Sequence, residues 1–227
     1  MSKKPDQTQP SFSFFSSLET DLLYYETLAR KKGFKQIAGI SYDGLDCLSG
    51  PIVVAIATFS KDIILPEMHT VHCLTTAQIR SCYNKILQLP GISYAVEVIE
   101  PEKIDELGAL EATSLAMKEL PLSLSKATDF LLVEGSQTPF NQKTSQPILK
   151  GEQFSLYIAY SYIIAKATRN AILEGLDANW PEYGFIQNKG YPTKEHLKTV
   201  KKLGLCPAHR KSQLQLLKAL IPSHTSL

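Results

Sequence analysis

Three acidic side chains follow or interrupt apolar runs of the kind that form buried strands. Glu134 comes directly after the run 130–133, and Asp43 and Asp46 lie in a loop rich in Gly, Asp and Ser between two β-branched runs. Ligands in α/β sheets bind at the carboxyl ends of strands, and hard divalent cations need several carboxylate oxygens. A plain turn at Asp43 and a solvated loop carboxylate at Asp46 are the alternatives that stay open.

The elements that must position these side chains alternate between strands and helices. Short β-branched runs predict strands, and apolar residues that recur every three to four positions predict helices. The predicted strands are 37–41, 52–60, 92–99 and 130–133, and the predicted helices are 18–32, one from Thr75 or Thr76 to Pro90, one from about Pro101 to near Pro121, 155–178, 194–203 and 214–221. This order predicts a single α/β domain with a mixed central sheet flanked by helices and a helical C-terminal part from about residue 180.

The composition fits one globular domain in a reducing compartment. The chain has 227 residues, of which 44% are apolar, and its 24 Lys and Arg against 22 Asp and Glu leave a net charge of +2. Net charge alone therefore cannot drive nucleic-acid binding, and any basic surface must be local. Four scattered cysteines, a polar start and no membrane-length apolar run predict a cytoplasmic protein outside the membrane. We expect a tail at 1–17, a domain over 18–215 and a C-terminal tail or helix end at 216–227.

Seven stretches of the chain resemble, in the same order, the motifs of one nuclease family. They are residues 39–51, 104–117, 132–136, 150–152, 163–170, 183–193 and 209–212. Residues 183–193 are close to the family pattern Tyr-Gly-Phe-x-x-His-Lys-Gly-Tyr-x-Thr, and residues 209–212 resemble His-Arg-Arg-Ser. Over about residues 20–215 the chain thus resembles ribonuclease HII, of the type 2 ribonuclease H family.

The resemblance implies a ribonuclease H-like fold and metal-assisted hydrolysis of RNA in an RNA/DNA hybrid. Two Mg²⁺ or Mn²⁺ ions, clamped by four family carboxylates, would carry that reaction. The four positions correspond here to Ser41, Tyr42, Glu134 and Asn170, so only Glu134 keeps an acidic side chain. A hydroxyl, a phenol and an amide are neutral at pH 7. We therefore predict weak metal binding at Glu134 at most, or none, and a nuclease that is inactive or strongly impaired.

Two alternatives use the same fold differently. In the first, Asp43, Asp46 or Glu152 completes a rearranged metal site beside Glu134, and the enzyme still cleaves RNA in hybrids. Asp43 lies two residues after Ser41, so on a continued strand the two side chains would share a face. In the second alternative, the fold serves as a protein-interaction module.

The positions that contact substrate in the family are only partly kept. The family's Gly-Arg-Gly loop contacts the 2′-hydroxyls and phosphate at the RNA–DNA junction, and it corresponds to Gly44-Leu45-Asp46. Leu45 cannot make the charged contact, and Asp46 repels phosphate. The kept substrate-binding positions are Gly44, Lys150, Lys166, Arg169, Lys189, Tyr191 and Arg210, of which Tyr191 matches the tyrosine that stacks on the junction sugar. We expect a monomer with weakened binding to an RNA/DNA hybrid or a ribonucleotide-containing duplex.

Some of these residues also have plainer interpretations. Lys166 and Arg169 fit ordinary solvated or salt-bridged positions on a long helix equally well. His196 and His209 have no carboxylate at a useful spacing, which favours a structural or surface role over catalysis. Cys47 lies inside the key loop without an evident base, which predicts an inert thiol.

Overall fold

The structure is a computed structural model that describes residues 21–220, with side chains described as far as residue 215. The tail predicted at 1–17 lies outside the described residues. Of the C-terminal end predicted at 216–227, residues 216–220 belong to the last helix and the rest lie outside the described part. No helix in the described part is long and apolar enough to cross a membrane.

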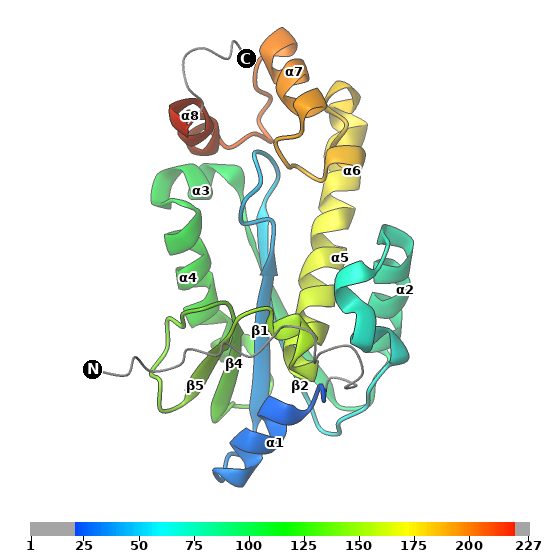
Figure 1. Ribbon diagram of the computed structural model, residues 1–227, viewed down its shortest axis with the longest axis vertical. Coiled ribbons are helices and arrows are strands. Elements are labelled where there is room, and N and C mark those ends of the chain that lie inside the picture. Colours follow the sequence, from blue (N-terminus) through cyan, green and yellow to red (C-terminus); the bar gives the residue numbers. More distant parts are fainter. Residues whose placement is uncertain (1–20, 221–227) are drawn as a thin grey trace, which may run out of the picture.

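Five strands form one mixed sheet in the order β3-β2-β1-β4-β5 (Figure 1). The strands are β1 (Ile37–Asp43), β2 (Ile52–Phe59), β3 (Ile92–Ile99), β4 (Phe130–Glu134) and β5 (Ser145–Ile148). β1 pairs antiparallel with β2 and parallel with β4, β2 pairs antiparallel with β3, and β4 pairs parallel with β5. The parallel pairing brings the carboxyl ends of β1 and β4 to one edge, and the predicted mixed sheet is confirmed.

Helices cover both faces of this sheet (Figure 1). They are α1 (Tyr24–Lys31), α2 (Thr76–Leu87), α3 (Pro101–Leu107), α4 (Ala109–Glu119), α5 (Leu156–Asn179), α6 (Phe185–Asn188), α7 (Lys194–Leu203) and α8 (Lys211–Leu220). One core cluster joins the sheet to α5 and α2, and a second joins its other face to α4. A third cluster lies among the C-terminal helices, next to the loop between β1 and β2.

The long helix α5 fixes the position of β1. Gly39 lies so close to α5 that an added Cβ would come within 2.2 Å of the Tyr157 carbonyl carbon. Ser161 Oγ donates a hydrogen bond of 2.8 Å to the Gly39 carbonyl. Because the contact is backbone against backbone, the side chains of β1 beyond Gly39 are held in a fixed register with α5.

Two predicted elements need correction. The single helix predicted from Pro101 to Pro121 is wrong, because the chain breaks at Gly108 (φ +83°) into α3 and α4. Glycine adopts this left-handed conformation without a steric penalty. The strand β5 was not predicted, since four residues that include Pro147 give almost no pattern. The predicted cap is confirmed at Thr75, which forms a capping box with Gln78.

Candidate functional site

Successive side chains of β1 point to opposite faces of the sheet at the candidate site. Tyr42 packs with the cluster on the α4 face, whereas Asp43 reaches α5, where its Oδ2 lies 3.5 Å from Arg169 Nη1. Ser41 shares the α5 face with Asp43, as the spacing predicts. Ser41 is fully buried, and within the described residues its Oγ has no hydrogen-bond partner.

Glu134 ends β4 and lies partly buried beside a second acidic residue. Its Oε2 accepts a hydrogen bond of 3.3 Å from the backbone N–H of Glu152. Burial, followed by the negative charge of the Glu152 side chain, raises the pKa of Glu134 to about 8. A carboxyl with that pKa is mostly protonated at pH 7, so Glu134 itself adds little negative charge to the site.

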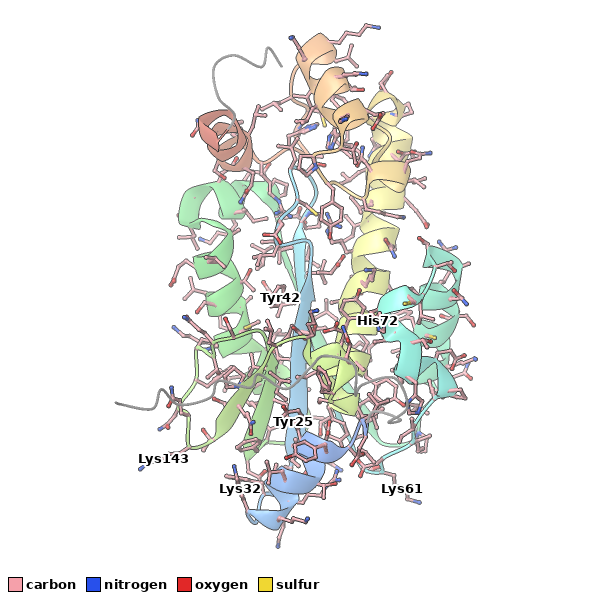
Figure 2. The ribbon with its side chains drawn as sticks, in the orientation of Figure 1. Tyr25, Lys32, Tyr42, Lys61, His72 and Lys143 are labelled. Atoms are coloured by element: carbon pink, nitrogen blue, oxygen red, sulfur yellow. The ribbon has the colours of Figure 1, made fainter. Side chains whose placement is uncertain are left out.

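Tyr42 and Glu134 line a cavity of about 500 Å³ that opens beside α4. Tyr42 lies at the centre of the molecule, beside β1 (Figure 2). Burial, then the charges of Glu134 and Asp46, raise the pKa of Tyr42, so the phenol is neutral. Among the remaining lining residues one, Glu111, is acidic, and none carries a positive charge. They are Leu45, Leu110, Glu111, Thr113, Ser114, Met117, Gly135, Ser136, Gln137, Thr138 and Pro139.

The fourth candidate position, Asn170, lies on α5 and is buried. A side-chain amide offers a neutral oxygen where a carboxylate would offer a negative charge. Among the residues whose side chains are described, no group of three or more His, Cys, Asp or Glu side chains could hold a metal ion. The acidic side chains near this edge are the Glu134–Glu152 pair and Glu111 across the cavity, with Asp43 held in its contact with Arg169.

Two buried arginines hold the loop that follows β1. Arg210 donates from Nε to Gly50 O at 2.9 Å, from Nη1 to Leu45 O at 3.0 Å and from Nη2 to Gly44 O at 2.7 Å. Burial lowers the pKa of Arg210 to about 10, so the guanidinium stays charged at pH 7. These are charge-assisted hydrogen bonds to three carbonyl groups of one loop, and they fix its shape.

Arg169 joins the same loop to the turn before α7. It donates from Nε to Pro51 O at 2.9 Å, from Nη2 to Ser49 O at 3.2 Å and from Nη1 to Lys189 O at 3.0 Å. The sequence suggested substrate contact for Arg169 and Arg210. In the structure both guanidiniums are buried and already bonded to backbone carbonyls, which makes them part of the framework of the loop.

The turn at 189–191 sits directly on this loop. The Gly190 carbonyl accepts hydrogen bonds from the backbone N–H groups of Leu48 (2.8 Å) and Ser49 (3.2 Å). An added Cβ on Gly190 would come within 2.4 Å of the Ser49 oxygen, so the approach requires glycine. Tyr191, next in the chain, is 46% exposed. The turn thus presents an aromatic ring to solvent above a rigid base.

The lysines of the candidate site differ in their surroundings. Lys166 Nζ donates a hydrogen bond of 2.6 Å to Tyr162 Oη; burial opposes its charge, but Asp43 and this hydrogen bond raise its pKa overall. Burial lowers the pKa of Lys189, against the attraction of Glu174. Lys150 is exposed and adopts a left-handed conformation (φ 55°). Lys189 belongs to the turn at 189–191, and Lys166 lies close enough to Tyr191 for the two side chains to affect each other's pKa. Lys150 lies two residues before Glu152 in the chain.

Sequence reasoning missed two features of this region. The cavity wall from α4 went unnoticed, although exposed apolar Leu110 lies within a stretch that matched a family motif. His196 and His209, taken as structural or surface residues, are buried and bonded to each other. Their spacing of thirteen residues gives no sequence pattern that would predict contact.

The mixed sheet and its long helix define a ribonuclease H-like fold, with the candidate site at the carboxyl ends of β1 and β4. The ribonuclease HII family model matches residues 38–216. A ribonuclease HII of Chlamydia trachomatis (serovar D) is 37% identical over 202 residues, which cover 87% of this chain and 93% of that protein. The chain belongs to the ribonuclease HII family.

Solved structures show the same fold. The ribonuclease H2 of Pyrococcus horikoshii OT3 superposes with a TM-score of 0.65 at 20% identity, over 82% of this chain and 98% of that one. A Bst-RNase HIII solved in complex with Mn²⁺ superposes with a TM-score of 0.50 at 15% identity, over 81% and 70% of the two chains. The metal in the latter belongs to that protein, and the likeness to this chain is one of fold.

Proposed function

We propose that this protein binds RNA/DNA hybrid, or a duplex that contains a ribonucleotide, without cleaving it. The observation that carries the proposal is the donor set at the edge formed by β1 and β4. Of the four positions that correspond to family carboxylates, Glu134 alone is acidic, and its pKa of about 8 keeps it mostly protonated at pH 7. Glu134 therefore offers two divalent ions little negative charge at pH 7.

The residues present do not fit two divalent cations. Mg²⁺ and Mn²⁺ favour carboxylate oxygens that balance their charge, whereas Ser41, Tyr42 and Asn170 supply neutral groups. The phenol of Tyr42 also takes up space beside Glu134 at the cavity. Both observations support weak metal binding or none at this site, and with it the loss of hydrolysis.

Other contacts support retained duplex binding. Arg169 and Arg210 keep the loop after β1 in one conformation, and within the described residues the backbone N–H groups of 44–46 have no acceptor. Three N–H groups in a fixed loop are suited to donate hydrogen bonds to oxygen atoms of a sugar or phosphate. The exposed ring of Tyr191 lies on the neighbouring turn and offers a stacking surface.

The enzyme alternative draws on one specific observation. Glu134 and Glu152 lie side by side, and a single metal ion could displace the proton that Glu134 holds at pH 7. Asp43 would have to leave Arg169 to join them, at the cost of that contact. A rearranged site of this kind would hold one ion, and it predicts cleavage that depends on Glu134.

A single assay separates these possibilities. A labelled duplex with one ribonucleotide is incubated with the protein in 10 mM Mg²⁺ or Mn²⁺, and binding to the same duplex is measured over a salt series. We expect binding that weakens with salt, without cleavage above a protein-free control. Cleavage that disappears in Glu134→Gln would refute the proposal in favour of the rearranged enzyme, and neither binding nor cleavage would favour a protein-interaction module.

A matched pair of variants tests where the duplex binds. Tyr191→Ala should weaken binding by about 5- to 150-fold, which corresponds to the ~1–3 kcal/mol of one base or sugar stacked on an aromatic ring. Tyr24→Ala removes a ring of similar exposure (56% against 46%) from α1, at the opposite end of the molecule (Figure 1). Equal effects of the two variants would contradict binding at the turn.

A further inference from the structure

A buried pair of histidines lies directly beneath the turn that carries Tyr191. His196 belongs to the first turn of α7, and His209 lies between α7 and α8. Both side chains are fully buried, among the rings of Tyr183 and Phe185. Neither histidine contacts the cavity or the Glu134–Glu152 pair, so the proposed function leaves their role open.

Hydrogen-bond partners of His196 determine where the protons of the pair lie. His196 Nδ1 lies 2.8 Å from the Tyr191 carbonyl oxygen, which only accepts, so Nδ1 carries a proton. His209 Nδ1 lies 3.1 Å from the backbone N–H of Cys206 and 3.3 Å from the Cys206 carbonyl oxygen, so this end taken alone allows the nitrogen either to accept or to donate.

The His196 assignment fixes the contact in the middle. The two Nε2 atoms are 3.0 Å apart, and in neutral rings His209 Nε2 carries the proton that the unprotonated His196 Nε2 accepts. His209 Nδ1 then carries no proton and accepts from the Cys206 amide, so the hydrogen bonds all run one way, from the Cys206 amide through His209 and His196 to the Tyr191 carbonyl. An extra proton on His196 would set two N–H groups against each other, and one on His209 Nδ1 would replace the bond from the Cys206 amide.

The surroundings keep both rings neutral. The titratable groups that contact them are the Cys206 thiol, whose Sγ lies 3.1 Å from His209 Nδ1, and the Tyr183 phenol, whose ring centre is 4.9 Å from that of His209. None of the ion pairs among the described residues involves either histidine. Burial lowers the pKa of both, that of His209 to about 4.

We propose that His196 and His209 are positioning residues, which hold the Tyr191 turn through this one-way relay of hydrogen bonds. The Tyr191 carbonyl accepts from the Thr193 backbone N–H (2.8 Å) as well as from His196. The relay thus ties the turn to the start of α7 and to the Cys206 segment. Its consequence for duplex binding rests on the proposed function, whereas the relay itself does not.

The first test reads the tautomers directly. Long-range ¹H–¹⁵N correlation spectra of the full chain at pH 7, assigned with His196→Asn and His209→Gln, report which ring nitrogens are protonated. We expect Nδ1–H for His196, which is the rarer tautomer in water, and Nε2–H for His209. The opposite tautomer at either residue, or a protonated ring, would overturn the proposal.

The second test asks whether the relay holds the turn. His196→Leu should speed amide hydrogen exchange at Tyr191 and Thr193 at least tenfold, while His196→Asn, whose amide can still donate to the Tyr191 carbonyl, should restore protection. Leucine at exposed His72 in the segment before α2 is the matched control, and it should leave exchange at the turn unchanged. Unchanged exchange in His196→Leu, or no recovery in His196→Asn, would refute positioning by His196.

A third measurement connects the relay to binding. His196→Leu should reduce, by about threefold or more, the preference for a duplex with one ribonucleotide over an all-DNA duplex, and His196→Asn should keep it. An unchanged preference in His196→Leu would refute the effect on recognition. If the unaltered protein binds neither duplex, the proposed function fails, and the tautomers and exchange rates still decide on the relay.

Discussion

Replacing Glu134 by Gln is expected to stabilise the protein at alkaline pH and to change little at pH 5. The folded protein holds the Glu134 proton up to a pKa of about 8, whereas a carboxyl in the unfolded chain releases it near its ordinary value of 4.5. Stability from this group is therefore fully present below pH 4.5 and is lost as pH rises toward 8. Glutamine keeps the shape of the neutral acid and cannot ionise.

The magnitude follows from the two pKa values. A difference of about 3.5 corresponds to at most ~5 kcal/mol, at about 1.4 kcal/mol for each pKa unit. Glu134 is only partly buried, and part of the shift comes from the charge of neighbouring Glu152, so solvent and rearrangement will reduce it. We expect Glu134→Gln to raise the free energy of unfolding by about 2 kcal/mol at pH 8.

Urea unfolding at pH 5, 7 and 8 measures this effect. The control is Glu111→Gln, which removes an exposed carboxylate from the same cavity and should show no comparable gain. A tightly bound ion would stabilise the folded state and shift its unfolding curve. We expect no tight binding, so adding 10 mM Mg²⁺ should leave the urea unfolding curves of the unaltered protein unchanged. A Glu134→Gln variant that is less stable than the unaltered protein at every pH, or stabilisation by Mg²⁺ that Glu134→Gln abolishes, would refute the reasoning.

Three further predictions concern the framework and the lost carboxylates. Arg210→Met should lower the free energy of unfolding, measured by urea titration, by about 3–5 kcal/mol, because three carbonyls of the loop lose a charged donor. A loss below about 1 kcal/mol would contradict the inference that Arg210 holds the loop. The triple variant Ser41→Asp, Tyr42→Glu, Asn170→Asp should bind Mn²⁺ at least tenfold more tightly by calorimetry, and no gain would mean that these positions do not converge on one site. The pKa of His209 is lowered from 6.5 to about 4 in the folded protein. The neutral ring therefore contributes up to ~3 kcal/mol to the free energy of unfolding above pH 6.5, and this contribution is lost as pH falls toward 4. His209→Gln should remove that part of the acid dependence in urea titrations.

The elements that sequence reasoning predicted well were those with strong local patterns. The strands β1 to β4 and the 24-residue helix α5 follow from apolar runs and a clear N-cap at Ser155. The break at Gly108 was missed because the apolar positions on either side of it continue the same helical spacing. A glycine inside a helical pattern allows either continuation or a left-handed break, and the packing of α4 against the sheet decides between them.

For the site, the sequence offers residue types but not contacts. That neutral residues stand at 41, 42 and 170 in place of family carboxylates stays a prediction from the resemblance to the family motifs. That Arg169 and Arg210 bond to backbone carbonyls cannot be seen there, because a guanidinium suits a phosphate and a carbonyl equally well. The loop and the two arginines are far apart in the chain, and only the folded structure brings them together.

The framework of the site depends on contacts that do not involve a metal. The loop after β1 is held by Arg169 and Arg210, and the turn at 189–191 is held by that loop and by His196. None of these contacts uses the side chains at 41, 42 and 170, so the proposed function leaves the framework intact with neutral residues there. The proposed loss of hydrolysis is therefore compatible with duplex-contacting surfaces that keep their shape, without the mutual repulsion of four carboxylates at one edge.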